Sequence, residues 1–216
     1  MNVSNLHERM RAFIFTGGNV WQDGVTEGPK EDDLVIAADA GLVTARRFGV
    51  EPSIVLGDFD TLGEPDVPKE TEVIRVPVEK DDTDTQLAVR VALERGAREI
   101  VIVGGLDGRL DHTLSTLAIL EELDARHIHA YITSGKNRAR FLRNNSTLLP
   151  RGNFRYFSLI AADPKVKGVS IDGCKYPLKN AKLSRLCQFA VSNEIVGNCA
   201  LIDVRRGGVW IVESND

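Results

Sequence analysis

Four groups of polar and charged residues in the first half of the chain have the residue types of a metal and phosphate site. They are Ala38-Asp39-Ala40-Gly41, Asp58-Phe59-Asp60, Lys80-Asp81-Asp82-Thr83-Asp84 and Gly105-Leu106-Asp107-Gly108-Arg109-Leu110-Asp111-His112. Each group follows an apolar run, and open α/β folds bind their ligands where the strands of the sheet end. The spacing therefore predicts one acidic site that binds a metal ion and phosphate.

The pair Asp58 and Asp60 is the first candidate for metal binding. If the chain is extended there, residues two positions apart point the same way, and both carboxylates can share one cation. Oxygen ligands of this kind suit Mg²⁺, which also keeps waters and phosphate oxygens. The alternative is an acidic turn that only contacts solvent.

The segment from Lys80 to Asp84 precedes a predicted helix. Thr83 and Gln86 have the spacing of a capping box, in which Thr83 would be the N-cap residue. Capping explains Thr83, but three carboxylates within four residues repel one another unless a cation or the helix N-terminus compensates them. A role in the site is therefore also expected for this segment.

The glycine-rich turn at residues 104–109 has the composition of a phosphate-binding loop. Glycines leave backbone N–H groups accessible, a helix is predicted to follow, and Arg109 offers a two-pronged contact for phosphate. The chain lacks the spacings of the P-loop and of the dinucleotide-binding fingerprint, so those two nucleotide sites are not expected. Asp111 and His112 either cap the helix or contact substrate.

The elements that would carry these groups alternate between strands and helices. Short runs rich in Val, Ile and Leu predict strands at residues 12–16, 34–38, 54–56, 73–76, 100–103 and 130–133, and helical composition is found at 42–48, 85–94 and 113–123. Nearly continuous apolar runs are typical of parallel strands buried on both faces. The pattern predicts an α/β domain with a parallel sheet in a three-layer arrangement.

The remainder of the chain has the pattern of a small all-β domain. Runs at 154–160, 169–171, 189–191, 200–204 and 209–212 are separated by turn residues, which indicates a β-sandwich. Arg205-Arg206-Gly207-Gly208 is expected to form a hairpin connection between the last two. We predict an α/β domain over residues 1–143 and a β-sandwich domain over residues 144–216.

Composition excludes several classes of protein. The 216 residues are 43% hydrophobic and 27% charged, no run approaches the ~18 apolar residues of a membrane span, and the start lacks a signal peptide. A cytoplasmic protein without a membrane partner is therefore expected. Residues 1–143 carry 17 basic and 25 acidic side chains, which argues against a nucleic-acid partner. The three cysteines are expected to be buried thiols.

Several short motifs occur in one order along the chain. They are Asp39-x-Gly41, Gly57-Asp-Phe-Asp-Thr61, Lys80-Asp-Asp-Thr-Asp84, Gly108-Arg-Leu-Asp-His112, Lys175-Tyr-Pro-Leu178 and Ser192-Asn-Glu194. In this order the chain resembles the thiamine pyrophosphokinase family from about residue 12 to residue 212. It departs from the family at Ala40, Thr61, Asp107 and Cys174, none of which is an expected ligand.

The resemblance implies a reaction and a set of roles. It implies a homodimer that transfers a diphosphoryl group from ATP to the hydroxyl of thiamine, giving thiamine diphosphate and AMP. Asp58, Asp60 and Asp84 match the Mg²⁺ site, and Lys80 and Arg109 would stabilise the phosphates. Asp39, Asp81, Thr83 and Arg109 match positions around ATP, while Asp111, Ser192 and Asn193 match positions near thiamine.

Three alternative functions remain open at this level. The acceptor could be another hydroxymethyl heteroaromatic compound, such as a pterin. The chain could bind a nucleotide or a thiamine compound as a sensor without turnover. An acidic metal phosphohydrolase would release phosphate without an acceptor, but the sequence lacks the His and Asp ligand series of such enzymes.

Overall fold

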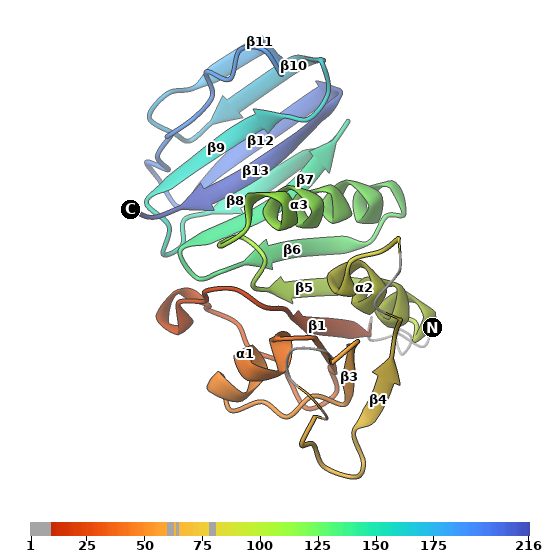
Figure 1. Cartoon of the computed structure of the whole chain (residues 1–216). Helices are drawn as coiled ribbons and strands as arrows, with labels where there is room; N and C mark the ends of the chain where they lie inside the picture. The colour runs from red at the N-terminus through yellow and green to blue at the C-terminus, as the bar shows by residue number, and fades with distance from the viewer. Residues whose placement is uncertain (1–9, 60–62, 64, 78–80) are drawn as a thin grey trace, which may run out of the picture. The chain divides into compact units, whose positions relative to one another are not determined.

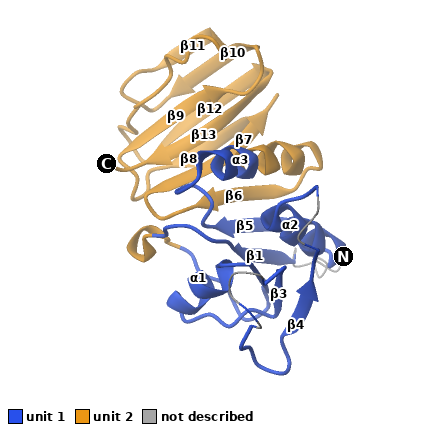
Figure 2. Cartoon of the chain, in the orientation of Figure 1, with its two compact units in different colours: residues 1–20, 27–116 blue, residues 21–26, 117–216 orange. Residues whose placement is uncertain are grey.

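The computed structural model describes residues 10–59, 63, 65–77 and 81–216, and it divides into two compact units (Figure 2). Unit 1 comprises residues 1–20 and 27–116, and unit 2 comprises residues 21–26 and 117–216. The residues of each unit pack mainly against other residues of the same unit. The predicted division into functional domains after residue 143 remains a proposal.

Unit 1 contains a parallel sheet, as predicted. In spatial order its strands are β4 (Glu72–Arg75), β3 (Ile54–Gly57), β2 (Leu34–Ala38), β1 (Arg11–Phe15) and β5 (Glu99–Val103). The residues of β1 and β3 are all buried, which explains why these strands are almost continuously apolar in the sequence. Every described connection between these strands returns the chain to the same end of the sheet.

The predicted helices are present in the structure (Figure 1). They are α1 (Gly41–Arg47), α2 (Asp84–Glu94) and α3 (Leu110–Ala125), and a short 3-10 helix covers Gln22–Gly24. The capping box of α2 is confirmed, because the backbone N–H of Thr83 donates to Gln86 Oε1 and the N–H of Gln86 donates to Thr83 Oγ1. Among the helices of the described segments, none combines the length and the apolar character needed to cross a membrane.

Unit 2 contains the predicted β-sandwich, but the strand expected at residues 130–133 in the parallel sheet pairs antiparallel within this unit. One antiparallel sheet has the order β6 (His129–Thr133), β7 (Asn137–Arg143), β13 (Gly208–Ser214) and β9 (Tyr156–Ala161), and the other has the order β11 (Leu178–Ser184), β10 (Lys165–Asp172), β12 (Cys199–Arg206) and β8 (Ser146–Pro150). Buried aliphatic residues from both sheets, such as Ile211 and Ile202, form one hydrophobic core.

Three predictions for this unit were wrong. Residues 189–191 form a loop, and the chain at Arg205-Arg206-Gly207-Gly208 passes from one sheet to the other, because β12 and β13 belong to different sheets. Cys187 and Cys199 are exposed thiols, and Cys174 is half-buried. The strands β7, β8 and β11 were not predicted, because their polar residues interrupt the apolar alternation.

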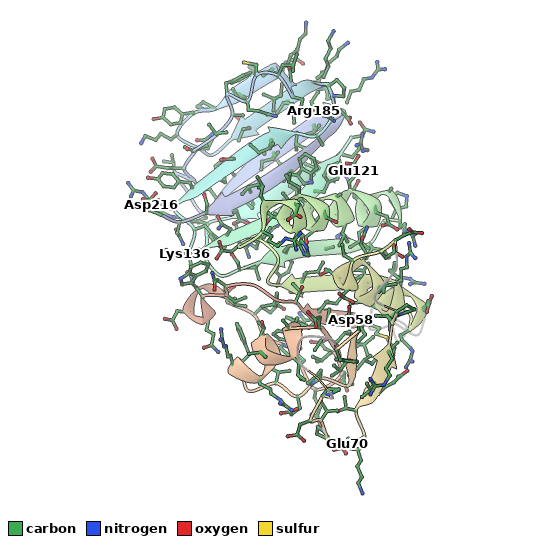
Figure 3. All side chains as sticks on the ribbon, viewed as in Figure 1. Asp58, Glu70, Glu121, Lys136, Arg185 and Asp216 are labelled. Carbon is green, nitrogen blue, oxygen red and sulfur yellow. The ribbon has the colours of Figure 1, made fainter. Side chains whose placement is uncertain are left out.

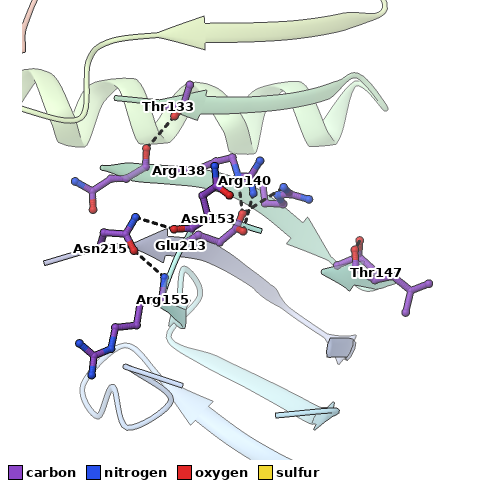
Figure 4. A network of polar contacts seen from close by, with 10 residues as sticks. Thr133, Arg138, Arg140, Thr147, Asn153, Arg155, Glu213 and Asn215 are labelled. Atoms are coloured by element: carbon purple, nitrogen blue, oxygen red, sulfur yellow. Dashed lines mark hydrogen bonds and ion pairs between the residues drawn. The ribbon is translucent and has the colours of Figure 1, made fainter. Parts of the chain in front are cut away.

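A buried ion-pair network joins β13 to β7 (Figure 4). Glu213 is 2% exposed and accepts two hydrogen bonds of 2.7 Å from Arg138 and one of 3.3 Å from Arg140. Burial lowers the pKa of Arg140. Asn215 extends the network, because its amide donates to the carbonyl of Asn153 and accepts from the N–H of Arg155, which holds the end of the chain against the segment before β9.

The short helix at residues 22–24 packs on the turn between β6 and β7. The backbone N–H of Trp21 donates to the carbonyl of Ser134, and the ammonium group of Lys136 lies 5.2 Å from the centre of the Trp21 ring. A Cβ on Gly135 would lie 1.9 Å from the Trp21 carbonyl oxygen. This close approach requires glycine at position 135 and joins two segments that are far apart in the sequence.

Candidate active site

A cavity of about 470 Å³ lies at the carboxyl ends of the strands of unit 1. The loops after β1, β2, β3 and β5 and the first turns of α2 and α3 surround it. The residues that line it are Thr16, Gly17, Gly18, Ala38, Asp39, Asp58, Asp82, Thr83, Asp84, Thr85, Gly105, Asp107, Gly108, Arg109, His112 and Thr116. All four groups identified in the sequence contribute to this wall. This agrees with the expectation that ligands bind at the carboxyl ends of the strands.

Asp39 reaches the cavity because the chain turns sharply after β2. Its φ of 46° is left-handed, which costs roughly 1–3 kcal/mol for a residue with a side chain. The turn is held by the Asp39 N–H, which donates to the carbonyl of Leu56 at 2.8 Å. A Cβ on Gly41 would lie 2.0 Å from the Phe15 carbonyl oxygen, so the Asp-x-Gly motif reflects the close packing of α1 on β1.

Asp58 lies at the end of β3 and lines the cavity (Figure 3). Phe59 adopts a φ of 57°, so the chain is not extended there, and the expectation that Asp58 and Asp60 point the same way loses its basis. The ring of Phe59 is 5% exposed and packs with Ala37, Leu42 and Val55. Phe59 therefore anchors the turn that presents Asp58.

The start of α2 brings three residues of the second acidic group to the cavity. Asp82, Thr83 and Asp84 line the wall, whereas Asp81 is exposed and does not. Asp82 is paired with Arg90 at 2.5 Å, which offsets one of the three neighbouring charges. Asp84 is the first residue of α2, where the positive end of the helix dipole favours a carboxylate or a phosphate.

The glycine-rich turn between β5 and α3 contributes Gly105, Asp107, Gly108 and Arg109 to the wall. Arg109 is exposed and donates two hydrogen bonds to Asp111, of which the shorter is 2.6 Å. This pair raises the pKa of Arg109 and lowers the pKa of Asp111. Asp111 itself does not line the cavity, although its partner Arg109 does. Its contact with thiamine stays a prediction.

The described wall of the cavity is strongly acidic. It contains five carboxylates, from Asp39, Asp58, Asp82, Asp84 and Asp107, against the single guanidinium group of Arg109. An anionic nucleotide would be repelled from such a wall unless a cation bound with it. Within the described ranges, no group of three or more acidic, His or Cys side chains is close enough to hold a metal ion by itself.

Two of the predicted site residues lie outside the described residues. These are Asp60, the third expected metal ligand, and Lys80, the expected phosphate contact. Asp58 and Asp84 can still serve as oxygen ligands, since Mg²⁺ is usually bound through one or two carboxylates and completes its shell with water and phosphate oxygens. The donor set is therefore compatible with magnesium.

The sequence interpretation missed the contribution of the first strand. Thr16, Gly17 and Gly18 follow β1 and line the cavity, and the hydroxyl of Thr16 lies 3.0 Å from that of Thr85 on α2. This hydrogen bond connects the loop after β1 to the helix that carries Asp84. The signal was present, because Thr16-Gly17-Gly18 ends an apolar run as the other groups do.

The two residues predicted near thiamine in the β-rich part belong to unit 2. Ser192 is exposed with a φ of 55°, and its N–H donates to Ser158 Oγ. Asn193 is 4% exposed, and its amide accepts from the N–H groups of Tyr176 and Glu194 and donates to the Tyr176 carbonyl. Asn193 therefore holds the loop that presents Ser192. Whether these residues contact thiamine stays a prediction.

The aromatic residues considered for stacking have different surroundings. Trp210 donates its indole N–H to the carbonyl of Leu117 and packs edge-on against Phe141 with 5.9 Å between ring centres. Tyr176 is 57% exposed, and its ring lies 5.5 Å from the Lys175 ammonium group. Of the two, Tyr176 has the accessible ring.

Comparison with known proteins agrees with this arrangement. The model of the family described as "Thiamin pyrophosphokinase, catalytic domain" matches residues 27–132. The model described as "Thiamin pyrophosphokinase, vitamin B1 binding domain" matches residues 146–209. The two matches together cover well over half of the chain, and the first includes the described residues of the cavity from Ala38 to Thr116.

Individual proteins give the same result. A thiamine pyrophosphokinase of Bacillus subtilis is 28% identical over 191 residues, which is 86% of this chain and 89% of that protein. One of Caenorhabditis elegans is 28% identical and covers 82% of this chain and 78% of its own. The crystal structure of a Bacillus subtilis thiamine pyrophosphokinase superposes with a TM-score of 0.84 at 25% identity, covering 96% of this chain and all of the other. The chain belongs to the thiamin pyrophosphokinase family.

Proposed function

We propose that this chain transfers a diphosphoryl group from ATP to the hydroxyl of thiamine and so forms thiamine diphosphate and AMP. The observation that carries the proposal is the cavity in unit 1, where five carboxylates, a glycine-rich turn and Arg109 meet at the ends of parallel strands. Membership of the family, through both its catalytic and its vitamin B1 binding models, supplies the acceptor.

The described residues suit the binding of a polyphosphate. In the reaction the hydroxyl oxygen attacks the β-phosphorus of ATP, the bond from that phosphorus to the α-phosphate oxygen breaks, and the hydroxyl proton is released. Such transfers depend on positioning and on stabilisation of negative charge. The N-terminus of α2 and the N–H group of Gly108 can donate hydrogen bonds to phosphate oxygens, and Arg109 can pair with them.

Magnesium is part of the proposal, with Asp58, Asp60 and Asp84 as its ligands. When bound, Mg²⁺ would neutralise phosphate charge and so permit ATP to enter an acidic cavity. Asp58 and Asp84 line one cavity and provide oxygen donors only, which suits this ion. Asp39 and Thr83 line the same cavity and are proposed to contact ATP, while Lys80 and Asp81 keep this role as predictions from the resemblance.

The activity is tested with purified protein, ATP, Mg²⁺ and thiamine, with AMP and thiamine diphosphate measured together. We expect equal amounts of both, and no AMP when thiamine is omitted. Phosphate release without an acceptor would instead identify a phosphohydrolase, and binding without turnover would identify a sensor. Faster turnover with a hydroxymethyl pterin than with thiamine would change the acceptor.

Asp58→Asn tests the metal site at a described residue. Loss of one charge from the cavity is expected to lower kcat at least about 100-fold, a size typical of a lost electrostatic contact to the reacting groups. Its melting temperature should stay unchanged, because Asp58 lies in the cavity wall and Phe59 anchors the turn. Asp32→Asn is the matched control, since Asp32 is exposed, does not line the wall and has no role in the proposal. Equal activity in both variants would remove Asp58 from the site.

We also propose a homodimer. The first turns of α3 expose two leucines, Leu110 at 70% and Leu114 at 59%, which are spaced by four residues and so share one face of the helix. Burial of this face against a second copy would remove the exposed apolar surface from water. Sedimentation equilibrium should give twice the mass of the 23.7 kDa chain.

A further inference from the structure

Thr16, the residue that follows β1, is bonded to three other elements of unit 1. Its backbone N–H donates to the carbonyl of Val103 at the end of β5, at 3.0 Å. Its carbonyl accepts a hydrogen bond of 3.1 Å from the hydroxyl of Thr44 on α1. Its own hydroxyl lies 3.0 Å from that of Thr85 on α2. Both the backbone and the side chain of Thr16 are therefore held in place.

Two glycines allow other segments to pack directly on Thr16. A Cβ on Gly104 would lie 2.7 Å from the Thr16 carbonyl oxygen and 2.9 Å from Thr16 Cγ2. A Cβ on Gly41 would lie 2.9 Å from Thr16 Cα. Because neither glycine has a Cβ, the turn after β5 and the start of α1 can both approach this closely. Close packing therefore fixes Thr16 in addition to its hydrogen bonds.

The hydrogen bond from Thr85 attaches the start of α2 to this fixed residue. The capping box joins Thr83 to Gln86 within the first turn of the helix. It sets the local shape of the helix start, but not the place of the helix against the sheet. The bond between Thr85 and Thr16 joins residues 69 positions apart in the sequence, so it constrains that place.

The hydroxyl of Thr85 differs in its partner from that of a threonine on α3. Within a helix, a threonine hydroxyl commonly donates to the backbone carbonyl four residues earlier. Thr116 does so, because its hydroxyl donates to the carbonyl of His112 at 2.8 Å. Thr85 is also buried in a helix, but its hydroxyl bonds to another element. Thr85 therefore connects α2 to β1 and does not bond within its own helix.

We propose that Thr16 and Thr85 are positioning residues that set the place of Asp84 for magnesium binding. Thr85 follows Asp84 directly, so a shift of the helix start would move the Asp84 carboxylate with it. All three residues line the same cavity. Mg²⁺ demands near-ideal octahedral geometry, so a small displacement of one ligand weakens its binding. The inference rests on the proposed function, in which Asp84 is a ligand of Mg²⁺.

Thr44 allows this role to be separated from a contribution to stability alone. Any hydrogen bond between buried groups contributes to stability, and its loss leaves a buried partner unsatisfied. Thr44 is 5% exposed and Thr85 is 8% exposed, and both hydroxyls bond to Thr16. Thr44 lies on α1, which carries none of the proposed metal ligands. The same substitution at the two positions should therefore have similar effects on stability and different effects on metal binding.

The test measures metal binding separately from turnover. Mn²⁺ binding to the full chain with α,β-methylene ATP is followed by the electron paramagnetic resonance signal of free Mn²⁺. The Mg²⁺ concentration for half-maximal thiamine-dependent AMP formation is measured in parallel. Thr85→Val should weaken Mn²⁺ binding about tenfold and raise the Mg²⁺ requirement similarly, as for lost partners of metal ligands, with an unchanged KM for thiamine. Thr85→Ser keeps the hydroxyl and should restore both values.

Thr16→Val should match Thr85→Val, and the double variant should lose no more than either single variant, because all three lack the same hydrogen bond. Thr44→Val is the control, which should lower the melting temperature as Thr85→Val does but bind Mn²⁺ as the wild type does. The proposal is overturned by absence of Mn²⁺ binding in the wild type, by wild-type affinity in Thr85→Val, by an equal loss in Thr44→Val, or by losses that multiply in the double variant. A wild type that binds Mn²⁺ but forms no AMP would contradict the proposed function alone, and the Mn²⁺ comparison would still decide the role of the threonines.

Discussion

Asn193 illustrates how a residue matched to a ligand can also hold the protein together. An asparagine amide can make four hydrogen bonds, and this one makes all four inside unit 2, the last to the sulfur of Cys174 at 3.3 Å. Asn193→Ala should therefore lower the free energy of unfolding by about 2 to 3 kcal/mol, because buried partners lose their hydrogen bonds. Urea unfolding measures this.

Ser192→Ala is the matched variant at the neighbouring position. Ser192 is exposed, and its described hydrogen bond comes from the backbone N–H, which alanine retains. Stability should be unchanged, and a raised KM for thiamine alone would support the predicted contact. A loss of stability in Ser192→Ala as large as in Asn193→Ala would contradict this division of roles.

The sequence indicates most of the cavity because ligand residues at strand ends are local features. Asp39, Asp58, Thr83, Asp84 and Arg109 were all predicted, and all line it. Thr85 and Thr116 were not, because a threonine within a helix has no distinctive pattern, and only the fold shows that both line the cavity. The role of Phe59 as an anchor depends on a left-handed turn that the sequence does not reveal.

At the scale of elements, the start of α2 connects helix stability to the site. Thr83 caps the helix whose first residue is Asp84. Thr83→Ala should cost about 1 kcal/mol of stability, the usual value of a lost N-cap, and should also reduce activity. Thr83→Ser keeps the hydroxyl and should restore both. Far-UV circular dichroism in urea measures the first effect, and an alanine variant as stable as the serine variant would contradict it.

Asp163 lies in the turn between β9 and β10, and its carboxylate contacts residues of β7 and β13. It accepts hydrogen bonds from Arg143 at 2.8 Å and from the Gly208 N–H at 3.0 Å, and the hydrogen bond from Arg143 lowers the pKa of its carboxyl group. A lowered pKa in the folded state stabilises the protein above the unfolded value of about 4, and this contribution is lost as the pH falls through the folded pKa.

Asp163→Asn should therefore be less stable than the wild type by about 1 kcal/mol at pH 7, and the difference should shrink below pH 4. Urea unfolding at pH 7 and pH 3 measures both values. Asp172→Asn, at an exposed carboxylate on β10, is the control and should show little change at either pH. A difference for Asp163→Asn that does not depend on pH would show that shape rather than charge is responsible.

Elements with regular apolar patterns were predictable, and those stabilised by distant polar contacts were not. The buried strands of unit 1 have continuous apolar runs, so their type and order along the chain follow from the sequence. Strand β7, with the sequence NRARFLR, contains three arginines, and their partners Glu213, Asp163 and Glu121 are distant in the sequence. No local pattern shows that these arginines will be paired.

At the scale of the whole molecule, the contact between Trp21 and Gly135 joins distant segments. Gly135→Ala should destabilise unit 2 by several kcal/mol, because a Cβ would meet the Trp21 carbonyl oxygen at 1.9 Å and because φ is 85°. Gly96→Ala has a comparable φ of 96° with nothing within 4 Å, so it should show only the backbone cost of roughly 1–2 kcal/mol. Thermal unfolding monitored by tryptophan fluorescence compares them, and equal losses would show that the contact is loose.

The same contact has a consequence for protein synthesis. Trp21 leaves the ribosome long before the turn at Gly135 exists, and chains grow at about 5–20 residues per second. Because 114 residues separate Trp21 from Gly135, the short helix at residues 22–24 must wait roughly 6 to 23 seconds for its packing partner. During that interval the Trp21 indole, which stays 39% exposed in the folded chain, lacks its contact with the Lys136 ammonium group.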